Sequence, residues 1–188
     1  LALTACQPVS NSHMVQLEQT LPSPLKISIA RDTAFNFAYE ENIQLLHRLG
    51  EVTFFSPLHD SVLPESDFVY LPGGYPELYL PGLSSNRSML QSIRDYAEAG
   101  GKLLAECGGM MYLCNEIKSS EGSSFPMVGL LNQSATMGQM KLRLGYRTLY
   151  YNDYVMTGHE FHYSRIEPQK EELPSVATAC TAKGSPVA

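Results

Sequence analysis

Short apolar runs alternate with segments of helical spacing between residues 26 and 106, and this alternation limits the chain to few folds. Residues 42–50 and 86–99 each place apolar side chains on one helical face, with Asn86 as an expected N-cap and Gly50 as an expected stop. The runs typical of buried strands are KISIA, VTFF, DFVYL and KLLAE, at residues 26–30, 52–55, 67–71 and 102–106. Strands that alternate with helices through short connections indicate a mostly parallel sheet with helices on both faces, so we expect an α/β fold.

The two ends of the chain follow other patterns. Residues 1–24 show no sustained period and end in a proline-punctuated stretch, so we interpret them as a linker or arm, partly disordered, ahead of one domain at residues 25–188. After Phe125, the extended runs MKLRLGYRTLYY and YVMTGHEFHYSRI meet at the sequence NDY. They predict an antiparallel hairpin added to the parallel core.

Composition excludes several classes of protein. A formal net charge of -6 without a basic cluster argues against nucleic-acid binding, and no apolar run is long enough to span a membrane. The four cysteines lack C-x-x-C spacing, which indicates neither a zinc site nor a disulfide framework. We therefore expect no metal site and a reducing, cytoplasmic location. The sequence is compatible with a homodimer but does not indicate the oligomeric state.

The stretch LLAECGGMMYL, residues 103–113, is the strongest candidate for chemistry. An apolar strand ends at Glu106, Cys107 follows, and Gly108 leads into a segment of helical spacing. This order matches a nucleophile elbow with sulfur in place of oxygen. We expect the N-terminus of the following helix to favour the thiolate and the Gly108 amide to hold an oxyanion. Cys114 is expected further along that helix as a core residue.

A second glycine pair, Gly73 and Gly74 in LPGGYPE, ends the preceding strand. Neighbouring parallel strands end on the same side of a sheet, so this loop is expected beside Cys107 as a second source of oxyanion donors. Either feature alone is more often a turn or a small buried residue. Their combination favours the functional interpretation.

Further polar residues follow strands at the same edge or lie in the hairpin. Asp32 and Asn36 follow the first strand, although their aromatic neighbours are equally consistent with packing. His159 and His162 fall on opposite faces of an extended run, which argues against a single metal or dyad that uses both. We regard these residues, together with Glu160, as candidate substrate or interdomain contacts.

Five motifs in order closely resemble the glutamine amidotransferase domain of cobyrinate a,c-diamide synthases: ARDTAFNFAYEEN, FFSPLHD, LPGGYPELY, LLAECGGMMYL and GHEFHYS. The resemblance covers roughly residues 26–170 and implies the class I glutaminase fold, which is flavodoxin-like. It makes Cys107 the nucleophile and places Gly108 and the Gly73–Gly74 loop at the oxyanion hole. Ala105 and Met111 depart from the wider class I pattern, but AECGG is what the cobyrinate branch uses.

The resemblance also implies a reaction in two halves. The cysteine releases ammonia from glutamine through a glutamyl thioester, and the domain itself needs no cofactor. A separate N-terminal domain uses ATP and magnesium to activate the a and c carboxylates of a cobyrinic acid macrocycle, which the ammonia converts to amides in cobalamin biosynthesis. We expect that domain to be absent here, because the chain has no G-x-x-x-x-G-K-[ST] motif.

The catalytic histidine of the family lies in a later segment that resembles ASYLHLH. The chain ends at Ala188 before such a segment, and neither His159 nor His162 matches it. We therefore expect a C-terminally incomplete domain, with its general base beyond residue 188, that alone is weakly active or inactive. Alternative functions are a nickel-sirohydrochlorin a,c-diamide synthase, a stand-alone cysteine hydrolase of the same fold, and a non-catalytic module that binds a partner domain.

Overall fold

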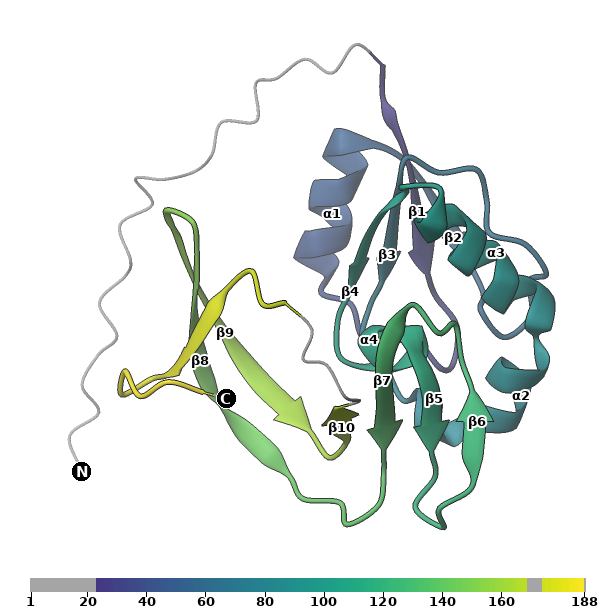
Figure 1. Ribbon diagram of the computed structural model, residues 1–188. Coiled ribbons are helices and arrows are strands. Elements are labelled where there is room, and N and C mark those ends of the chain that lie inside the picture. The colour runs from purple at the N-terminus through teal and green to yellow at the C-terminus, as the bar shows by residue number, and fades with distance from the viewer. Residues whose placement is uncertain (1–22, 169–173, 188) are drawn as a thin grey trace.

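The computed structural model describes residues 23–168 and 174–187, and a four-stranded parallel sheet lies at its centre (Figure 1). The strand order is β2-β1-β3-β4, and each neighbouring pair is parallel. The strands are β1 (Leu25–Ala30), β2 (Gly50–Phe55), β3 (Phe68–Leu71) and β4 (Lys102–Ala105). All four strands predicted from apolar runs are confirmed. The predicted arm at residues 1–24 lies almost wholly outside the described residues.

Helices cover both faces of this sheet, as the alternation predicts (Figure 1). On one face, Ile27, Ile29 and Tyr70 pack against apolar residues of α1 (Glu40–Leu49). On the other face, the core includes residues of β3 and of α3 (Arg87–Glu98). The Asn86 side chain accepts a hydrogen bond from the Met89 amide at 3.4 Å, which confirms the expected cap of α3.

A second, mixed sheet follows the nucleophile segment and was not predicted. Its strand order is β10-β7-β5-β6, with β5 parallel to β7 and the other pairs antiparallel. The short helix α4 (Gly108–Leu113) connects the two sheets in the chain, whereas η1 (Pro76–Leu78) and α2 (Leu80–Ser85) follow β3 within the parallel part. The strands are β5 (Cys114–Lys118), β6 (Ser124–Pro126), β7 (Leu131–Thr136) and β10 (Arg165–Pro168).

Cys114 lies in the mixed sheet and not, as expected, in the helix after Cys107. The helix ends at Leu113, and Cys114 begins β5 rather than continuing the helix. Its burial in the main core agrees with the expectation.

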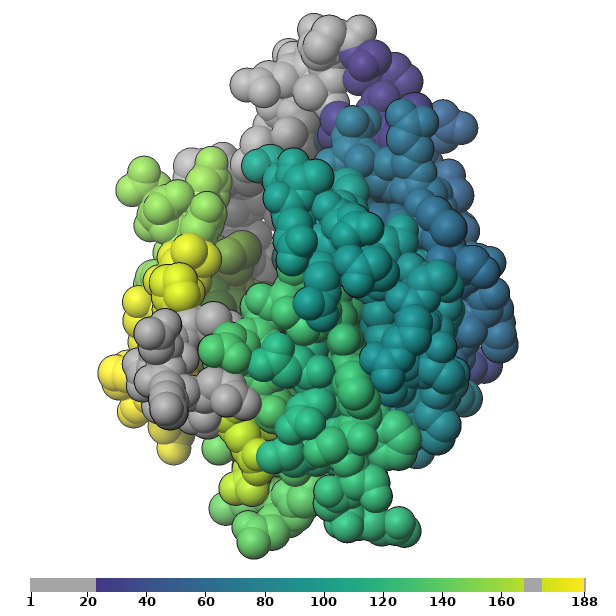
Figure 2. Space-filling view, turned by 45° about the vertical axis from the view of Figure 1, so that its right-hand side comes forward, coloured from purple at the N-terminus to yellow at the C-terminus, as the bar shows by residue number. Residues whose placement is uncertain are grey.

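The predicted antiparallel hairpin is confirmed as β8 (Arg143–Tyr151) and β9 (Tyr154–His162). The expectation that it is added to the parallel sheet is wrong. Instead β8 also pairs with β11 (Thr178–Thr181), and the hairpin forms a separate three-stranded sheet. In the space-filling view the blue, teal and green residues form one continuous surface, and the light green and yellow residues of the hairpin sheet lie along one side (Figure 2). No helix in the described part of the chain is long and apolar enough to cross a membrane.

Candidate active site

Cys107 lies at the junction between β4 and α4, at the carboxyl edge of the parallel sheet. Its backbone adopts φ 47° and ψ −110°, a conformation that residues other than glycine rarely adopt. The preceding residue, Glu106, still donates its amide hydrogen to the Leu71 carbonyl at 3.0 Å, so the turn begins directly at the cysteine. Such strain at one exposed thiol is typical of a functional elbow and confirms the predicted strand–Cys–helix order.

Two backbone amides converge on this thiol. The amides of Gly108 and Gly74 both hydrogen-bond to Cys107 and lower the pKa of its thiol. Gly108 belongs to the elbow, whereas Gly74 comes from the loop after β3. The structure therefore brings the two glycine motifs together as expected, and their amides are suited to hold a negative oxygen.

The close approach of these segments leaves no space for side chains. A Cβ atom on Gly108 would lie 2.8 Å from Pro76 Cδ and 3.1 Å from the Gly74 nitrogen. A Cβ atom on Gly74, whose φ is +159°, would lie 2.1 Å from the Ala34 carbonyl oxygen. Glycine at both positions is thus a steric requirement of the site.

The loop after β1 holds the Gly73–Gly74 loop in place. The Phe37 amide donates to the Gly73 carbonyl at 3.1 Å, and the Tyr75 amide donates to the Ala34 carbonyl at 2.9 Å. Asp32 organises this loop, since its carboxylate accepts hydrogen bonds from two amides of its own loop, from the Leu58 amide and from the Ser56 hydroxyl. These four bonds give Asp32 a structural role, and a contact with substrate or another domain stays a prediction.

A pocket of about 480 Å³ lies beside the site rather than at Cys107. Asp32 and the exposed Asn36 line it, together with residues at the carboxyl ends of β1 and β2 and in α1. None of Cys107, Gly73, Gly74 and Gly108 belongs to its lining. Asp32 and Asn36 lie at the carboxyl edge of the sheet, as expected. The pocket that they line does not include Cys107.

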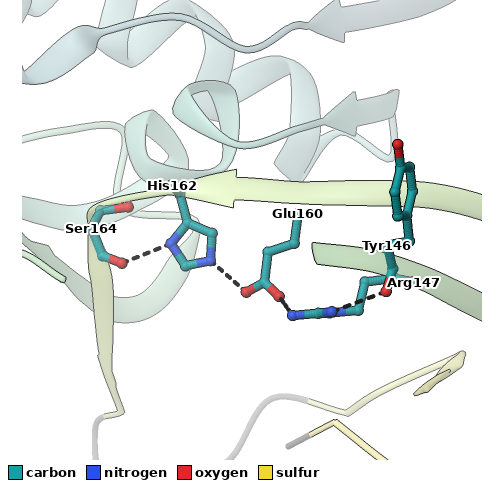
Figure 3. A network of polar contacts seen from close by, with 5 residues as sticks. All are labelled: Tyr146, Arg147, Glu160, His162 and Ser164. Atoms are coloured by element: carbon teal, nitrogen blue, oxygen red, sulfur yellow. Dashed lines mark hydrogen bonds and ion pairs between the residues drawn. The ribbon is translucent and has the colours of Figure 1, made fainter. Parts of the chain in front are cut away.

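The hairpin residues divide into two sets, as their alternation predicts. His159 faces the loop after β1, where its ring nitrogens lie 3.4 Å from the Tyr39 hydroxyl. On the other face, His162 contacts Glu160 at 2.7 Å and the Ser164 carbonyl at 2.8 Å, and Glu160 also pairs with Arg147 (Figure 3). Glu160 and His162 are therefore occupied by a network within the hairpin.

That network controls the charge of Glu160. Partial burial raises the pKa of its carboxyl group, but the hydrogen bonds from His162 and Arg147 outweigh this effect and lower the pKa overall.

Tyr146 projects from the opposite face of the hairpin (Figure 3). A role of Glu160 or His162 toward another domain stays a prediction.

Two carboxylates oppose the amides at the nucleophile. Partial desolvation is the main cause that raises the pKa of the Cys107 thiol, and the charges of Glu77 and Glu106 raise it further. The Gly108 and Gly74 amides lower the pKa but do not compensate, although the thiol remains accessible. The Gly108 amide at the helix N-terminus acts in the expected direction, but burial and the two carboxylates, which the sequence did not reveal, raise the pKa of the thiol overall.

Comparison with solved structures supports the fold. The chain matches the structure of PurLQS from Thermotoga maritima with a TM-score of 0.59 and 16% sequence identity, over 88% of this chain and 87% of that one. It also matches a glutamine amidotransferase crystal structure with a TM-score of 0.52 and 15% identity, over 84% and 85% of the two chains. At such identities the likeness concerns the arrangement of the backbone alone.

The family model for the CobB/CobQ-like glutamine amidotransferase domain matches residues 26–185. The chain belongs to this family. The amidotransferase domain therefore includes both glycine motifs, the cysteine elbow and the hairpin sheet.

Curated relatives of this amidotransferase domain are longer proteins. A cobyrinate a,c-diamide synthase of Clostridium acetobutylicum is 45% identical over 161 residues, which cover 81% of this chain and 36% of the relative. A hydrogenobyrinate a,c-diamide synthase of Pseudomonas aeruginosa is 39% identical over 180 residues, which cover 92% and 41% of the two chains. The chain thus spans about two fifths or less of the length of these relatives.

Two residues near Cys107, Tyr70 and Glu77, are not among the site residues predicted from the sequence. The Tyr70 hydroxyl donates to Glu106 Oε2 at 2.6 Å, and the charge of Glu77 acts on Cys107. The signal for Tyr70 was its place near the end of β3, since β3 and β4 are parallel neighbours that end at the same edge. The signal for Glu77 was its position directly after the Gly73–Gly74 loop.

The raised pKa of Cys107 predicts how the amidotransferase domain reacts with a neutral electrophile. We expect iodoacetamide to alkylate Cys107 of the folded chain with a pH midpoint above that of the unfolded chain, because only the thiolate reacts and its fraction at a given pH falls as the pKa rises. The rate should increase steadily from neutral to alkaline pH. Mass spectrometry of the peptide that contains Cys107 measures it.

The same chain in denaturant provides the reference midpoint for this titration. Cys114 serves as an internal control in the folded chain. Burial raises the pKa of its thiol to about 11 and shields it from iodoacetamide, so we expect it to stay unlabelled. A midpoint for folded Cys107 at or below the denatured value would show that the two amides dominate over burial and the carboxylates.

Proposed function

We propose that this chain is the glutaminase part of a cobyrinate a,c-diamide synthase. The convergence of the Gly74 and Gly108 amides on the thiol of Cys107, within a chain of the amidotransferase family, carries this proposal. The two amides provide the hydrogen bonds that a tetrahedral intermediate of glutamine cleavage requires. Chain identities of 45% and 39% to two a,c-diamide synthases support the choice of overall reaction.

In the proposed mechanism the sulfur of Cys107 attacks the side-chain amide carbon of glutamine. The amides of Gly74 and Gly108 stabilise the oxygen that becomes negative, and collapse of the intermediate breaks the carbon–nitrogen bond. The nitrogen takes up the proton that the thiol gives up and leaves as ammonia. Water then hydrolyses the glutamyl thioester, which releases glutamate and restores the thiol.

The ammonia would be used in a part of the protein that this chain does not contain. We propose that a synthetase domain, which accounts for the remaining length of the relatives, activates the a and c carboxylates of a cobyrinic acid-type macrocycle with ATP and magnesium in the cytoplasm. Ammonia then converts each activated carboxylate into an amide. ATP and magnesium have no role at Cys107, whose reaction needs glutamine, water, the two amides and a base.

Amidation of defined macrocycles by the native protein tests this proposal. With ATP, magnesium and glutamine labelled with ¹⁵N in its side-chain amide, we expect cobyrinate to gain label at two carboxylates, because ammonia from glutamine is the nitrogen source. Mass spectrometry of the macrocycle measures the product. Hydrogenobyrinate is the second candidate substrate, favoured by the Pseudomonas aeruginosa relative, and nickel-sirohydrochlorin is the third substrate to compare.

The outcomes separate the alternative functions. If hydrogenobyrinate or nickel-sirohydrochlorin gains label faster than cobyrinate, that macrocycle is the substrate instead. Glutamine hydrolysis that ATP and macrocycle leave unchanged would indicate a stand-alone hydrolase. No use of glutamine by the folded native protein would refute an enzymatic role and leave the binding module.

A further inference from the structure

Glu106 directly precedes the nucleophile and is exposed at the carboxyl edge of the parallel sheet. The Tyr70 hydroxyl donates to its Oε2 atom at 2.6 Å, and Tyr70 itself is only 2% exposed. Burial and the hydrogen bond to Glu106 both raise the pKa of Tyr70, so it stays protonated as a donor. A buried residue therefore holds one oxygen of this carboxylate, whereas Oε1 has no hydrogen-bond partner among the described residues.

Two carboxyl groups lie near the thiol, and neither forms an ion pair with a cationic side chain among the described residues. They belong to Glu77 and Glu106, which both act on Cys107. Two carboxylates beside a nucleophilic thiol disfavour the thiolate that the reaction requires. A substrate that brings its own positive charge to this position would remove the conflict.

Glu106 is better suited than Glu77 to bind such a charge. Glu77 is half-buried, and desolvation raises the pKa of its carboxyl group, which favours the neutral form. Glu106 is exposed, and Tyr70 fixes its orientation. A fixed and accessible carboxylate loses little conformational entropy when it pairs with a ligand.

We propose that Glu106 binds the α-ammonium group of the glutamine whose side-chain amide Cys107 attacks, an assignment that rests on the proposed function. An extended glutamine places its ammonium nitrogen roughly 5 Å from its amide carbon, given carbon–carbon bonds of about 1.5 Å. Glu106 directly precedes Cys107 and its charge acts on the thiol, as expected of a carboxylate close to the position of that nitrogen. Tyr70 is then a positioning residue that acts through Glu106.

This assignment explains how substrate can activate its own nucleophile. The bound ammonium would neutralise Glu106 and remove one cause of the high pKa of the Cys107 thiol. An amide without an α-ammonium group would leave the thiol as it is in the free protein. The site would therefore favour glutamine over glutaramate, which has the same amide and carboxylate but no amino group.

Two electrophiles that differ in this group test the assignment in the native protein. 6-Diazo-5-oxo-L-norleucine has the α-ammonium and α-carboxylate groups of glutamine, whereas iodoacetamide has neither. We expect Glu106→Gln to lower the second-order rate constant for labelling of Cys107 by the diazo compound by roughly 10-fold or more, the effect of losing a hydrogen bond between charged groups. Labelling by iodoacetamide should be no slower than in the wild-type chain, because removal of a neighbouring negative charge favours the thiolate.

Matched variants make the comparison specific. Glu98→Gln removes an exposed carboxylate at the end of α3 and should leave both rates unchanged. Glu106→Asp should retain part of the rate with the diazo compound, since the charge remains. Tyr70→Phe should give an intermediate loss that appears in the concentration for half-maximal rate rather than in the limiting rate, since the carboxylate remains but is no longer held.

The outcomes distinguish this inference from the proposed function. Rapid labelling of wild-type Cys107 by the diazo compound, with an equal rate in Glu106→Gln, would overturn the role of Glu106 and leave the glutaminase assignment intact. A selective loss in Glu77→Gln instead would also overturn it. A wild-type Cys107 that iodoacetamide labels but the diazo compound does not would overturn both.

Discussion

Replacement of Cys107 by alanine is expected to abolish glutamine-dependent amidation by the native protein and to spare amidation driven by added ammonia. In the proposed mechanism this thiol acts in glutamine cleavage alone, where the Gly74 and Gly108 amides that converge on it hold the oxyanion. Removal of a catalytic nucleophile costs a factor on the order of 10⁴ or more in kcat. Ammonia added to the medium replaces the missing product, so the synthetase reaction should keep its rate.

Amidation rates are measured with glutamine and with added ammonia, for Cys107→Ala and for a matched cysteine variant. Cys180→Ala removes a partly exposed thiol of β11, in the hairpin sheet, and should leave both rates unchanged. Circular dichroism and thermal unfolding show whether each variant is folded. Loss of both activities in a folded Cys107→Ala protein would show that the thiol acts in the synthetase reaction or in assembly instead.

The parallel sheet and its two main helices were predictable because their side chains follow simple periods. Ile27 and Ile29 alternate with polar or small residues in β1, and Met89, Leu90 and Ile93 of α3 are buried on one helical face. The core of an α/β layer selects for such patterns directly. The elbow was predictable for a related reason, since only small residues fit around Cys107.

The mixed sheet was not predictable from apolar periodicity. β7 has the sequence LNQSAT, and its buried Ser134 and Thr136 are polar. Ser134 donates to Glu116 at 3.0 Å, and Thr136 accepts from the Gly138 amide at 3.0 Å. The bond to Glu116 forms only after β7 meets β5, and the bond from Gly138 satisfies Thr136 locally. These bonds make the burial of polar side chains favourable without leaving an apolar period in the sequence.

The electrostatics of the candidate site also depend on tertiary contacts. The position of Cys107 at a helix N-terminus is visible in the sequence and suggests a lowered pKa. The opposing charge of Glu77 comes from η1, a separate segment, and the orientation of Glu106 depends on Tyr70 in β3. The sequence therefore predicts the candidate nucleophile, its amides and the direction in which these amides shift the thiol pKa, but not the larger opposing effect of burial and the two carboxylates.

Replacement of Gly108 by valine is expected to lower kcat for glutamine cleavage by a factor on the order of 10² or more, the effect of losing one oxyanion donor. Even the first carbon of a side chain would lie 2.8 Å from Pro76 Cδ and 3.0 Å from the Gly74 carbonyl oxygen. The elbow and the Gly73–Gly74 loop would have to separate, and their two amides would then no longer meet at the sulfur. Glutamine turnover by the native protein and labelling of Cys107 by 6-diazo-5-oxo-L-norleucine both measure this loss.

Gly158→Val is the matched control for this substitution. Gly158 lies in β9 at an exposed position, and a Cβ atom there would meet no heavy atom within 4 Å. Valine also suits an extended strand, so we expect turnover and thermal stability to stay close to those of the wild-type protein. If Gly108→Val is folded and as active as Gly158→Val, the amide of Gly108 does not hold the oxyanion. The donor would then have to be sought in the Gly73–Gly74 loop alone, because that loop contributes the other amide that contacts Cys107.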